Sequence, residues 1–413
     1  MNADATRYDV AIVGGGMVGA SLALALQQTP LKVLAIEAHP PESALQPSFD
    51  DRTTALGNGA RRILEALGAW PQIAAAAGAI RSIHVSDAGR FGFARLEAAE
   101  HQLEAFGYTV SNRHIGAALW QALRAGGRIE LACPARLLAI DVETGGVRLR
   151  IAAGAGGERT VSAALVVAAD GAHSLVRQAA GIPSNDSDYG QVAVVANLRT
   201  DRPAAGIAYE RFSRSGPMAL LPLRTGHYTA VWALEPTAAA AAQACEPARF
   251  CEQLQSSFGW RVGRILEVGH RAGYRLELLR ALDQTAPRVA LIGNAAQALH
   301  PVAAQGFNLG LRDAAVLAEL IASAADPGAP AILAQFAARR AADRRGMIAF
   351  TDTLVKLFGE QRAAAAGVRN LGLLLFDVSA PAKRALARLS FGFGGTLPRL
   401  SRGLPLTQAQ RCS

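Results

Sequence analysis

Buried strands and helices alternate in the first part of this 413-residue chain. Val10–Val13 is an uninterrupted apolar run, a helical pattern follows it, and a second apolar run, Val33–Ile36, ends at Glu37. Apolar runs of strand length that flank a helix are typical of a βαβ unit, whose strands are buried on both faces. Ala164–Ala169 and Arg288–Ile292 have the same buried-strand character. The pattern therefore predicts an α/β core assembled from distant parts of the chain.

The middle of the chain has a different pattern. Short runs rich in β-branched, aromatic and leucine residues are separated by turn signals such as Ser215-Gly216-Pro217 and Arg224-Thr225-Gly226. Runs of this kind are typical of antiparallel strands. We therefore expect an antiparallel sheet inserted between parts of the α/β core, with strands at Gln191–Leu198, Ile207–Phe212, Met218–Leu223 and His227–Leu234.

Helical periodicity occurs in most of the remaining segments. The Asp326-Pro327-Gly328 tripeptide is a stop signal for one of these helices. The Pro-rich stretch His39–Pro47 predicts a loop, and the Ala-rich stretch Thr237–Ala244 predicts an ordinary helix or loop. The helices are predicted around Ala60–Leu67, over Gly107–Arg124, from about Gly306 toward Ala325, and over most of 331–402.

Three glycines, Gly14, Gly16 and Gly19, follow the first apolar run directly and form a G-x-G-x-x-G motif. Gly14 allows the tight turn, Gly16 lets the backbone approach a pyrophosphate, and Gly19 permits close helix–strand packing. The amides and the dipole at the start of the helix favour phosphate groups. Glu37 lies 23 residues beyond Gly14, near the spacing of about 20 for the acid that binds a ribose diol. The segment therefore predicts a dinucleotide-binding site.

Composition narrows the class of protein. Hydrophobic residues make up 51% of the chain, charged residues 18%, and the formal net charge is +9. Basic residues are scattered without an aromatic-interleaved basic stretch, so we expect no nucleic-acid partner. The four cysteines form no C-x-x-C pair and no metal-ligand spacing, which predicts reduced thiols, a cytoplasmic location and no metal site.

Membrane-spanning segments are not expected from the sequence. Val10–Leu31 carries no charge, but three consecutive glycines and a Gln-Gln-Thr-Pro stretch interrupt it, and no small-residue cleavage site follows. Leu371–Phe376 is apolar but only six residues long. A local excess of basic residues surrounds this second segment, and it includes Lys383, Arg384 and Arg388. The excess suits a helical segment that lies on an anionic membrane surface, or a helical pair with solvated arginines.

A second motif, VVAADGAHSLVR, spans Val166–Arg177. A buried strand ends there at Asp170-Gly171, and Ser174 is a plausible helix cap. The carboxyl ends of strands are where ligands bind in open α/β sheets. Taken alone, the segment fits a ligand-binding carboxylate or a plain turn with a cap.

The third motif, GNAAQALHPVAAQGFNLGLRD, spans Gly293–Asp313. A strand ends at Gly293-Asn294, His300-Pro301 begins a loop, and Gln305-Gly306 opens a helix whose dipole favours a negative group. A generic strand–loop–helix crossover is the alternative, but it does not require so many Gly, Asn and Gln residues.

With these three motifs in this order, the chain resembles the FAD-dependent aromatic hydroxylases. Within that family it is most similar to the ubiquinone-biosynthesis hydroxylases, and among them to the 2-polyprenyl-6-methoxyphenol hydroxylase branch. Two departures stand out: Asn294 and Gln297 occupy the places of Asp and His in the usual Gly-Asp-Ala-Ala-His, and Ala304 replaces a usual glycine. The resemblance covers essentially the whole chain and extends to Asp51–Leu56, Ile83–Asp87, Tyr189–Ala193 and Thr351–Val355.

The resemblance implies an α/β fold, α+β overall. We expect a Rossmann-like FAD-binding domain, an inserted and mostly antiparallel β-sheet substrate domain, and a helical C-terminal region. The predicted boundaries are 1–80, 107–184 and 285–345 for the FAD-binding domain, 81–106 and 185–284 for the substrate domain, and 346–413 for the C-terminal region.

Site residues are carried over by the same resemblance. His300, Gln305 and Gly306 are the candidate catalytic positions, although a lone His before Pro also suits a loop-ordering hydrogen bond. Arg52 and Arg113 are assigned to the phosphates and the ribityl edge, with solvated surface arginines as the alternative. The full cofactor-binding set is Gly14, Gly16, Gly19, Glu37, Arg52, Arg113, Asp170, Gly171, Asn294, Gly306 and Asn308.

The implied reaction uses FAD with NADPH or NADH as co-substrate. NAD(P)H reduces the flavin, O₂ adds to give a C4a-hydroperoxide, and a hydroxyl group is transferred to a phenol ring. The expected substrate is a polyprenyl phenol, and the expected partners are an anionic membrane surface, on the inner face of the cytoplasmic membrane, and other ubiquinone-pathway enzymes. A hydroxylase of a soluble aromatic compound and a non-catalytic FAD-binding scaffold are the alternatives.

Overall fold

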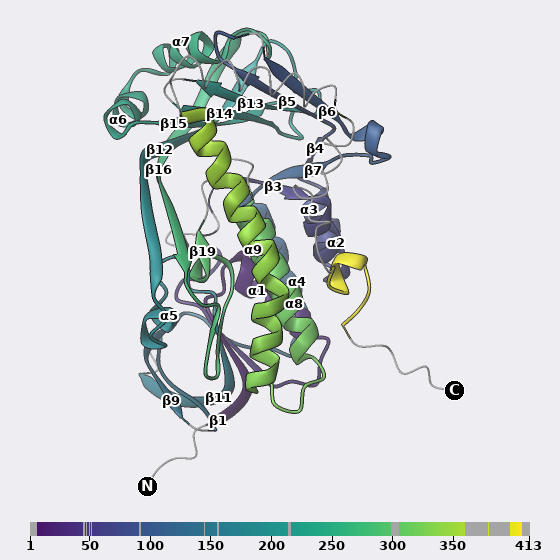
Figure 1. Cartoon of the computed structure of the whole chain (residues 1–413), viewed down its shortest axis with the longest axis vertical. Coiled ribbons are helices and arrows are strands. Elements are labelled where there is room, and N and C mark those ends of the chain that lie inside the picture. The colour runs from purple at the N-terminus through teal and green to yellow at the C-terminus, as the bar shows by residue number, and fades with distance from the viewer. Residues whose placement is uncertain are drawn as a thin grey trace.

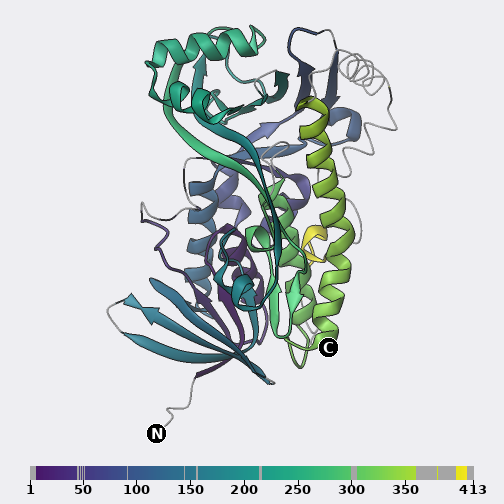
Figure 2. The same cartoon turned by 60° about the vertical axis from the view of Figure 1, so that its left-hand side comes forward.

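The computed structural model describes most of the chain, namely residues 6–43, 46, 48, 50, 52–90, 92–143, 145–154, 157–213, 216–298, 305–359, 379 and 397–406. Its strands form two eight-stranded sheets and one three-stranded sheet. Figures 1 and 2 show one large sheet at the end of the molecule that carries the N-terminus and the other at the opposite end.

The first large sheet has the order β17–β18–β11–β1–β2–β8, and β10 and β9 extend from β11. Its central strands are parallel: β1 (Thr6–Val13) lies between β2 (Val33–Ile36) and β11 (Glu158–Ala168). The parallel set is completed by β8 (Glu130–Ala132) beside β2 and β18 (Val289–Leu291) beside β11. The antiparallel members are β9 (Ala135–Glu143), β10 (Gly146–Ala153) and the edge strand β17 (Thr285–Ala286).

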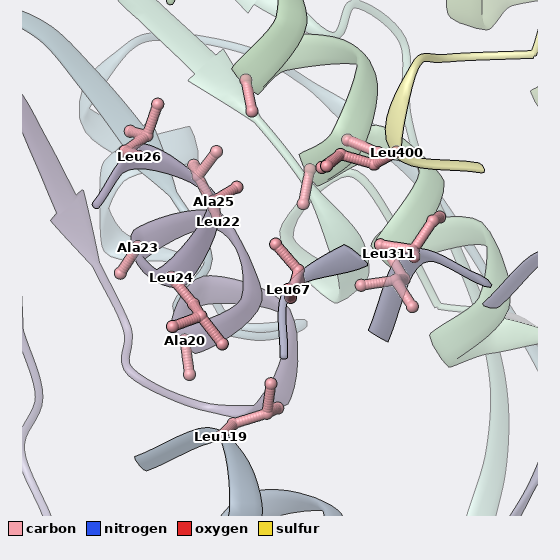
Figure 3. Close-up of a cluster of buried hydrophobic side chains, with 14 of the residues drawn as sticks. Ala20, Leu22, Ala23, Leu24, Ala25, Leu26, Leu67, Leu119, Leu311 and Leu400 are labelled. Carbon is pink, nitrogen blue, oxygen red and sulfur yellow. The ribbon is translucent and has the colours of Figure 1, made fainter. Parts of the chain in front are cut away.

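Both faces of this sheet are buried, which explains the uninterrupted apolar runs. On one face, α1 (Met17–Leu26) contacts α4 (Asn112–Gly126) and α8 (Gly306–Ile321). Figure 3 shows side chains of α1 gathered with Leu119 of α4, Leu311 of α8 and Leu400. Smaller elements complete this side, namely α2 (Asn58–Ala66), α3 (Trp70–Ala74) and η5 (Leu400–Arg402).

The opposite face of the sheet packs against the β9–β10 hairpin and α5 (Leu175–Ala179). Successive residues of β1 therefore enter different cores: Val10 and Ile12 belong to the helical side, and Ala11 and Val13 belong to the hairpin side. A strand with both faces buried has no polar alternation, as the sequence pattern indicated.

The second large sheet has the order β19–β16–β12–β15–β14–β13–β5–β6. Its pairs are antiparallel except β13 with β5. One face is covered by α6 (Pro236–Ala244) and α7 (Pro247–Phe258), through a core that includes Trp232 and Phe250. The strands are β5 (Ser82–Asp87), β6 (Phe93–Glu97), β12 (Ser184–Thr200), β13 (Ile207–Ser213), β14 (Gly216–Pro222), β15 (Tyr228–Leu234), β16 (Ile265–Ala281) and β19 (Gln297–Ala298).

Four predicted strands of the inserted sheet correspond to β12–β15, so the predicted fold class is confirmed. One predicted helix began too early. Gly107–Ser111 forms β7, which pairs with β3 (Thr53–Gly57) and β4 (Gly78–Ile80) in the small sheet. Thr109 and Val110 are β-branched, and Ser111 keeps extended backbone angles, so the helix starts only at Asn112. Another predicted helix ends early, since α8 stops at Ile321 and not near Ala325.

A 30-residue helix, α9 (Pro330–Gly359), runs lengthwise through the molecule. Figures 1 and 2 show that it begins near the first sheet and reaches the strands of the second. It contacts both α8 and β14. Within the part of the chain that the structure describes, no helix combines the length and apolar character needed to span a membrane.

Candidate cofactor-binding and active site

The glycine motif lies where the sequence placed it, in the turn from β1 to α1. Gly14 has φ +101°, and a Cβ there would lie 2.3 Å from the Ala169 carbonyl oxygen. A Cβ on Gly19 would lie 1.9 Å from the Gly14 carbonyl oxygen. Only glycine at these two positions allows α1 to pack so close to the strand ends. The backbone at the start of α1 is thereby placed beside β11.

The carboxylate of Glu37, at the end of β2, is buried beside the same turn. Its Oε2 accepts a hydrogen bond from the Gly15 amide at 2.5 Å, and its Oε1 accepts one from the His39 amide at 2.9 Å. A carboxylate has about four acceptor sites, so these two bonds leave capacity for a ribose diol. Burial raises the pKa of the neighbouring Cys133 thiol to about 11, and the charge of Glu37 adds to this effect.

Trp120 was not singled out from the sequence, yet it packs against the glycine turn. Its indole Nε1 donates to the Gly15 carbonyl oxygen at 2.9 Å, and its ring atom Cζ2 would lie 2.9 Å from a Cβ on Gly15. Gly15 is the unassigned glycine between the motif positions. The spacing of the motif could have drawn attention to it, but nothing in the sequence pairs it with a tryptophan 105 residues away.

The second motif folds as a capped helix start. Ser174 caps α5 as predicted, because its hydroxyl accepts from the Arg177 amide at 3.0 Å. Asp170 Oδ2 accepts from the amides of Leu175 and Val176, at 2.8 and 3.3 Å. Burial raises the pKa of the Asp170 carboxyl, against the lowering effect of these hydrogen bonds and of Ser174. Its other oxygen, Oδ1, is buried and has no hydrogen-bond partner among the described residues, so it can accept from a ligand.

The two predicted arginines come together around residue 50. Arg52 Nε forms an ion pair with Asp50 Oδ2 at 2.5 Å, and the Arg113 amide donates to the Asp50 carbonyl oxygen at 3.0 Å. The guanidinium of Arg52 also lies over the ring of Tyr274, 4.4 Å from its centroid. Tyr274 belongs to β16, so this cluster joins the cofactor side to the substrate sheet. No sequence pattern singled out Asp50 or Tyr274.

In the third motif, Asn294 is exposed between buried neighbours. Gly293–Ala295 forms the short helix η3, in which Gly293 and Ala295 are buried and Asn294 is exposed. Gly306 begins α8 as predicted, and a Cβ there would meet nothing within 4 Å. Gln305 is buried at the N-cap position of that helix. His300 and Ala304 lie outside the described residues.

The side chain of Asn308 connects α8 to β3. Its Oδ1 accepts from the Gly57 amide at 2.9 Å, and its Nδ2 donates to the Ala55 carbonyl oxygen at 2.8 Å. These two bonds hold β3 against α8. The amide of Asn308 thus supports the wall of the site.

A buried network of charged side chains lies behind the third motif. Arg340 joins two carboxylates: its Nε lies 2.7 Å from Asp313 Oδ1, and its Nη1 lies 2.5 Å from Asp343 Oδ2. Arg312 Nη1 is 2.8 Å from the other oxygen of Asp343. Sequence reasoning missed the Arg340–Asp313 and Arg312–Asp343 pairs, because the members of each pair are 27 and 31 residues apart and lie on two helices.

The residues present fit FAD. Backbone amides at the start of α1 suit a pyrophosphate, and Glu37 suits a ribose diol. The unpartnered Oδ1 of Asp170 suits a hydroxyl donor, and the exposed amide of Asn294 can donate or accept. The start of α8 carries no acidic residue in its first turn, so its dipole favours the negative edge of a reduced flavin.

Comparisons with known proteins agree with this geometry. Residues 7–351 match the family model described as the FAD binding domain. The ubiquinone hydroxylase UbiL of Rhodospirillum rubrum is 38% identical over 405 residues, which cover 96% of this chain and 93% of that protein. The 3-demethoxyubiquinol 3-hydroxylase of Escherichia coli is 31% identical over 390 residues, which cover 93% of this chain and 98% of that protein.

Solved structures share the fold. The p-nitrophenol 4-monooxygenase PnpA of Pseudomonas putida superposes with a TM-score of 0.77 at 20% identity, over 92% of this chain and 97% of that one. The strand order, the glycine turn and the family match all indicate an FAD-binding fold. The chain belongs to the FAD-binding-domain family and is a flavin-dependent monooxygenase of the group that includes the ubiquinone hydroxylases.

Proposed function

We propose that this enzyme hydroxylates the aromatic ring of a polyprenylated phenol in ubiquinone biosynthesis, with NADPH or NADH and O₂ as co-substrates. The relatives named above support the pathway. The observation that carries the substrate class is a row of aliphatic side chains on the second large sheet.

This row crosses four strands. Ala219 pairs with Val231, Val231 pairs with Val195, and Val195 pairs with Ala272. Paired residues share one face of a sheet, and the other face is the one that packs against α6 and α7. All four side chains are partly exposed, so they present an apolar surface on the free face.

The neighbouring rows show which part of the molecule this face of the sheet is turned toward. On one side, Thr229 Oγ1 lies 2.8 Å from Thr53 Oγ1 of β3. On the other side, the Tyr274 hydroxyl donates to Asp50 Oδ2 at 3.2 Å. Because both flanking rows contact the cofactor-binding part, the aliphatic row faces the space between the sheet and the cofactor site.

The residues paired in these three rows, which also contain Leu221, Asn197, Ala193 and Ala233, include no Arg, Lys or His. An aromatic carboxylate placed over the aliphatic row would lose its hydration, and the cation beside it, Arg52 over the Tyr274 ring, is already paired with Asp50, so its burial is costly. An uncharged phenol with an apolar chain fits the surface better. This favours the prenylated substrate over a soluble aromatic acid.

FAD, when bound, accepts the hydride of NAD(P)H and activates O₂. We infer that Glu37 holds the ribose hydroxyls and that the amides after Gly14 hold the pyrophosphate. Arg52 and Arg113, oriented around residue 50, neutralise the phosphates. Asp170 accepts from a hydroxyl of the bound cofactor.

At the ring end of the cofactor, we infer that Asn294 binds the ribityl chain. The start of α8 at Gly306, with Gln305, stabilises negative charge on the reduced flavin. The aliphatic row holds the phenol ring and excludes water from the reacting carbon. His300 is proposed to order the loop before α8 or to act near the flavin.

The test compares substrates on the purified, yellow protein. We expect NAD(P)H oxidation coupled to hydroxylation with a short-chain prenylated phenol, and uncoupled peroxide release with a hydroxybenzoate. Val231→Arg should abolish coupling with the prenylated phenol while flavin remains bound. The matched control is Leu138→Arg, at an exposed position on β9. Equal coupling by both arginine variants would refute the assignment of this face.

Cells that lack the protein supply a second readout. Analysis of their quinone lipids should show an accumulated precursor that lacks one ring hydroxyl. An unchanged quinone profile would remove this enzyme from the pathway.

We also propose that the enzyme docks on an anionic membrane surface through the basic C-terminal segment. The residues concerned, including Leu371–Phe376, Lys383, Arg384 and Arg388, lie outside the described part, so the support is the sequence. Each basic residue near such a surface contributes about 1 kcal/mol. Sedimentation with anionic liposomes should fall when the three basic residues become Gln. Equal binding by both proteins would refute this docking segment.

A further inference from the structure

The turn that carries Asn294 is held through its backbone by side chains of three helices. Asp313 Oδ2 of α8 accepts from the Gly293 amide at 3.3 Å. Arg177 Nη1 of α5 donates to the Ala295 carbonyl oxygen at 3.0 Å. Arg344 Nη2 of α9 donates to the Ala296 carbonyl oxygen at 3.3 Å. Within this turn only Asn294 is exposed, so the clamp fixes the residue that faces the cofactor site.

Gln297 links two of these clamping residues. Its Nε2 donates to Asp313 Oδ2 at 2.7 Å, and its Oε1 accepts from Arg344 Nε at 2.7 Å. The side chain is 2% exposed, and Asp313 is 0% exposed. The side-chain amide of Gln297 therefore donates to the buried carboxylate of Asp313 and accepts from the buried guanidinium of Arg344. Without it, Asp313 Oδ2 would keep only the longer bond from the Gly293 amide, and Arg344 Nε would lose its acceptor, which is costly in the interior.

The chemistry of this position explains the departure from the family pattern. A neutral histidine also offers one N–H donor and one nitrogen acceptor, on opposite sides of its ring. Glutamine and histidine can therefore make the same two connections between α8 and α9. A methionine fills nearly the same volume but supplies neither connection.

We propose that Gln297 is a positioning residue for Asn294. By joining Asp313 to Arg344, it holds the Gly293–Ala296 turn so that the Asn294 amide is presented to the ribityl part of FAD. This inference rests on the proposed placement of the cofactor at the strand ends and deepens it. It does not depend on which phenol is hydroxylated.

The test uses three variants of the full-length protein: Gln297→His, Gln297→Met and Asn294→Ala. We expect the FAD dissociation constant, measured by flavin fluorescence, to stay within about threefold of wild type in Gln297→His. In Gln297→Met it should rise at least about tenfold, and a larger fraction of NAD(P)H should end as peroxide. Arg339→Gln is the matched control, because Arg339 also lies on α9 but pairs with Glu319 outside the network.

A double-mutant cycle separates positioning from general stability. If Gln297 acts through Asn294, the double variant Gln297→Met/Asn294→Ala should bind FAD about as weakly as the weaker single variant. The proposal would be overturned if the fold-increases in the FAD dissociation constant of the two single variants multiplied in the double variant. It would also be overturned if Gln297→His and Gln297→Met bound FAD equally well. If Gln297→Met fails to fold, the shorter Gln297→Asn takes its place in the cycle. Absence of hydroxylation of prenylated phenols would contradict the proposed function but would leave these dissociation constants unchanged.

Discussion

Gly19→Ala is the sharpest single test of the cofactor turn. The new methyl group would lie 1.9 Å from the Gly14 carbonyl oxygen and 3.1 Å from Ala169 Cβ. Since comfortable contacts begin at roughly 3.5 Å, α1 would have to move by more than about 1 Å. Overpacking of this kind costs about 1–3 kcal/mol or more. The same substitution gains at most about 1 kcal/mol in helix propensity, so a net loss is expected.

Gly346→Ala provides the matched comparison. Gly346 lies inside α9, and a Cβ there would meet nothing within 4 Å. The propensity gain of up to about 1 kcal/mol should therefore appear without a packing cost. Because the propensity gain is common to both alanine variants, their free energies of unfolding should differ by the packing cost alone, roughly 1–3 kcal/mol or more.

Urea unfolding of the FAD-free proteins measures this difference, and fluorescence titration measures FAD affinity. We expect Gly19→Ala to bind FAD at least about tenfold more weakly, because 1.4 kcal/mol corresponds to a factor of ten. Gly346→Ala should bind FAD like wild type. The reasoning would be refuted by a Gly19→Ala protein as stable as wild type with unchanged FAD affinity.

Three further predictions concern single polar residues. Glu37→Gln should weaken FAD mildly, because an amide still accepts from the diol but loses charge-assisted strength; an unchanged dissociation constant would show that another residue holds the ribose. Asn294→Asp should retain FAD and lower the flavin reduction potential, because a carboxylate disfavours added negative charge; a potential equal to wild type would place Asn294 away from the ring. Burial lowers the pKa of His84 to about 4, with nearby Arg261 adding to the effect, so its neutral form is favoured in the folded protein. Stability from this source, at most about 3 kcal/mol, should be lost as pH falls from 6.5 toward 4. His84→Gln should therefore reduce the change of the urea midpoint with pH over that range. An unchanged pH dependence would show that another group controls it.

Local sequence patterns were enough to predict the βαβ unit, the inserted sheet and the glycine turn. Each of these depends on residues close together in the chain, such as Val10–Gly19, whose spacing reflects local geometry. In the hairpin of β9 and β10, β10 alternates apolar and basic residues and could have been predicted. β9 escaped prediction because some of its outward positions are not polar. Leu138 and Val142 are 44% and 45% exposed, which blurs the alternation that marks a strand.

The parts of the site that could not be predicted depend on long-range packing. Trp120 reaches Gly15, and Tyr274 reaches Asp50 across 224 residues. Arg344 is one of many arginines in an Ala- and Arg-rich segment, and nothing local separates it from a solvated surface residue. Only the fold places it, at 9% exposure, beside Gln297.

The strand order has a consequence for how the enzyme is made. β1 emerges first from the ribosome, yet its neighbour β11 follows about 150 residues later, and β18 pairs with β11 only after residue 289. Until then, a growing chain presents the end of β11, Val166–Ala168, with an unpaired edge, which favours intermolecular pairing. Asp313 and Arg344 arrive later still. The proposed FAD site and the network behind it are therefore complete only after Arg344 has been synthesised.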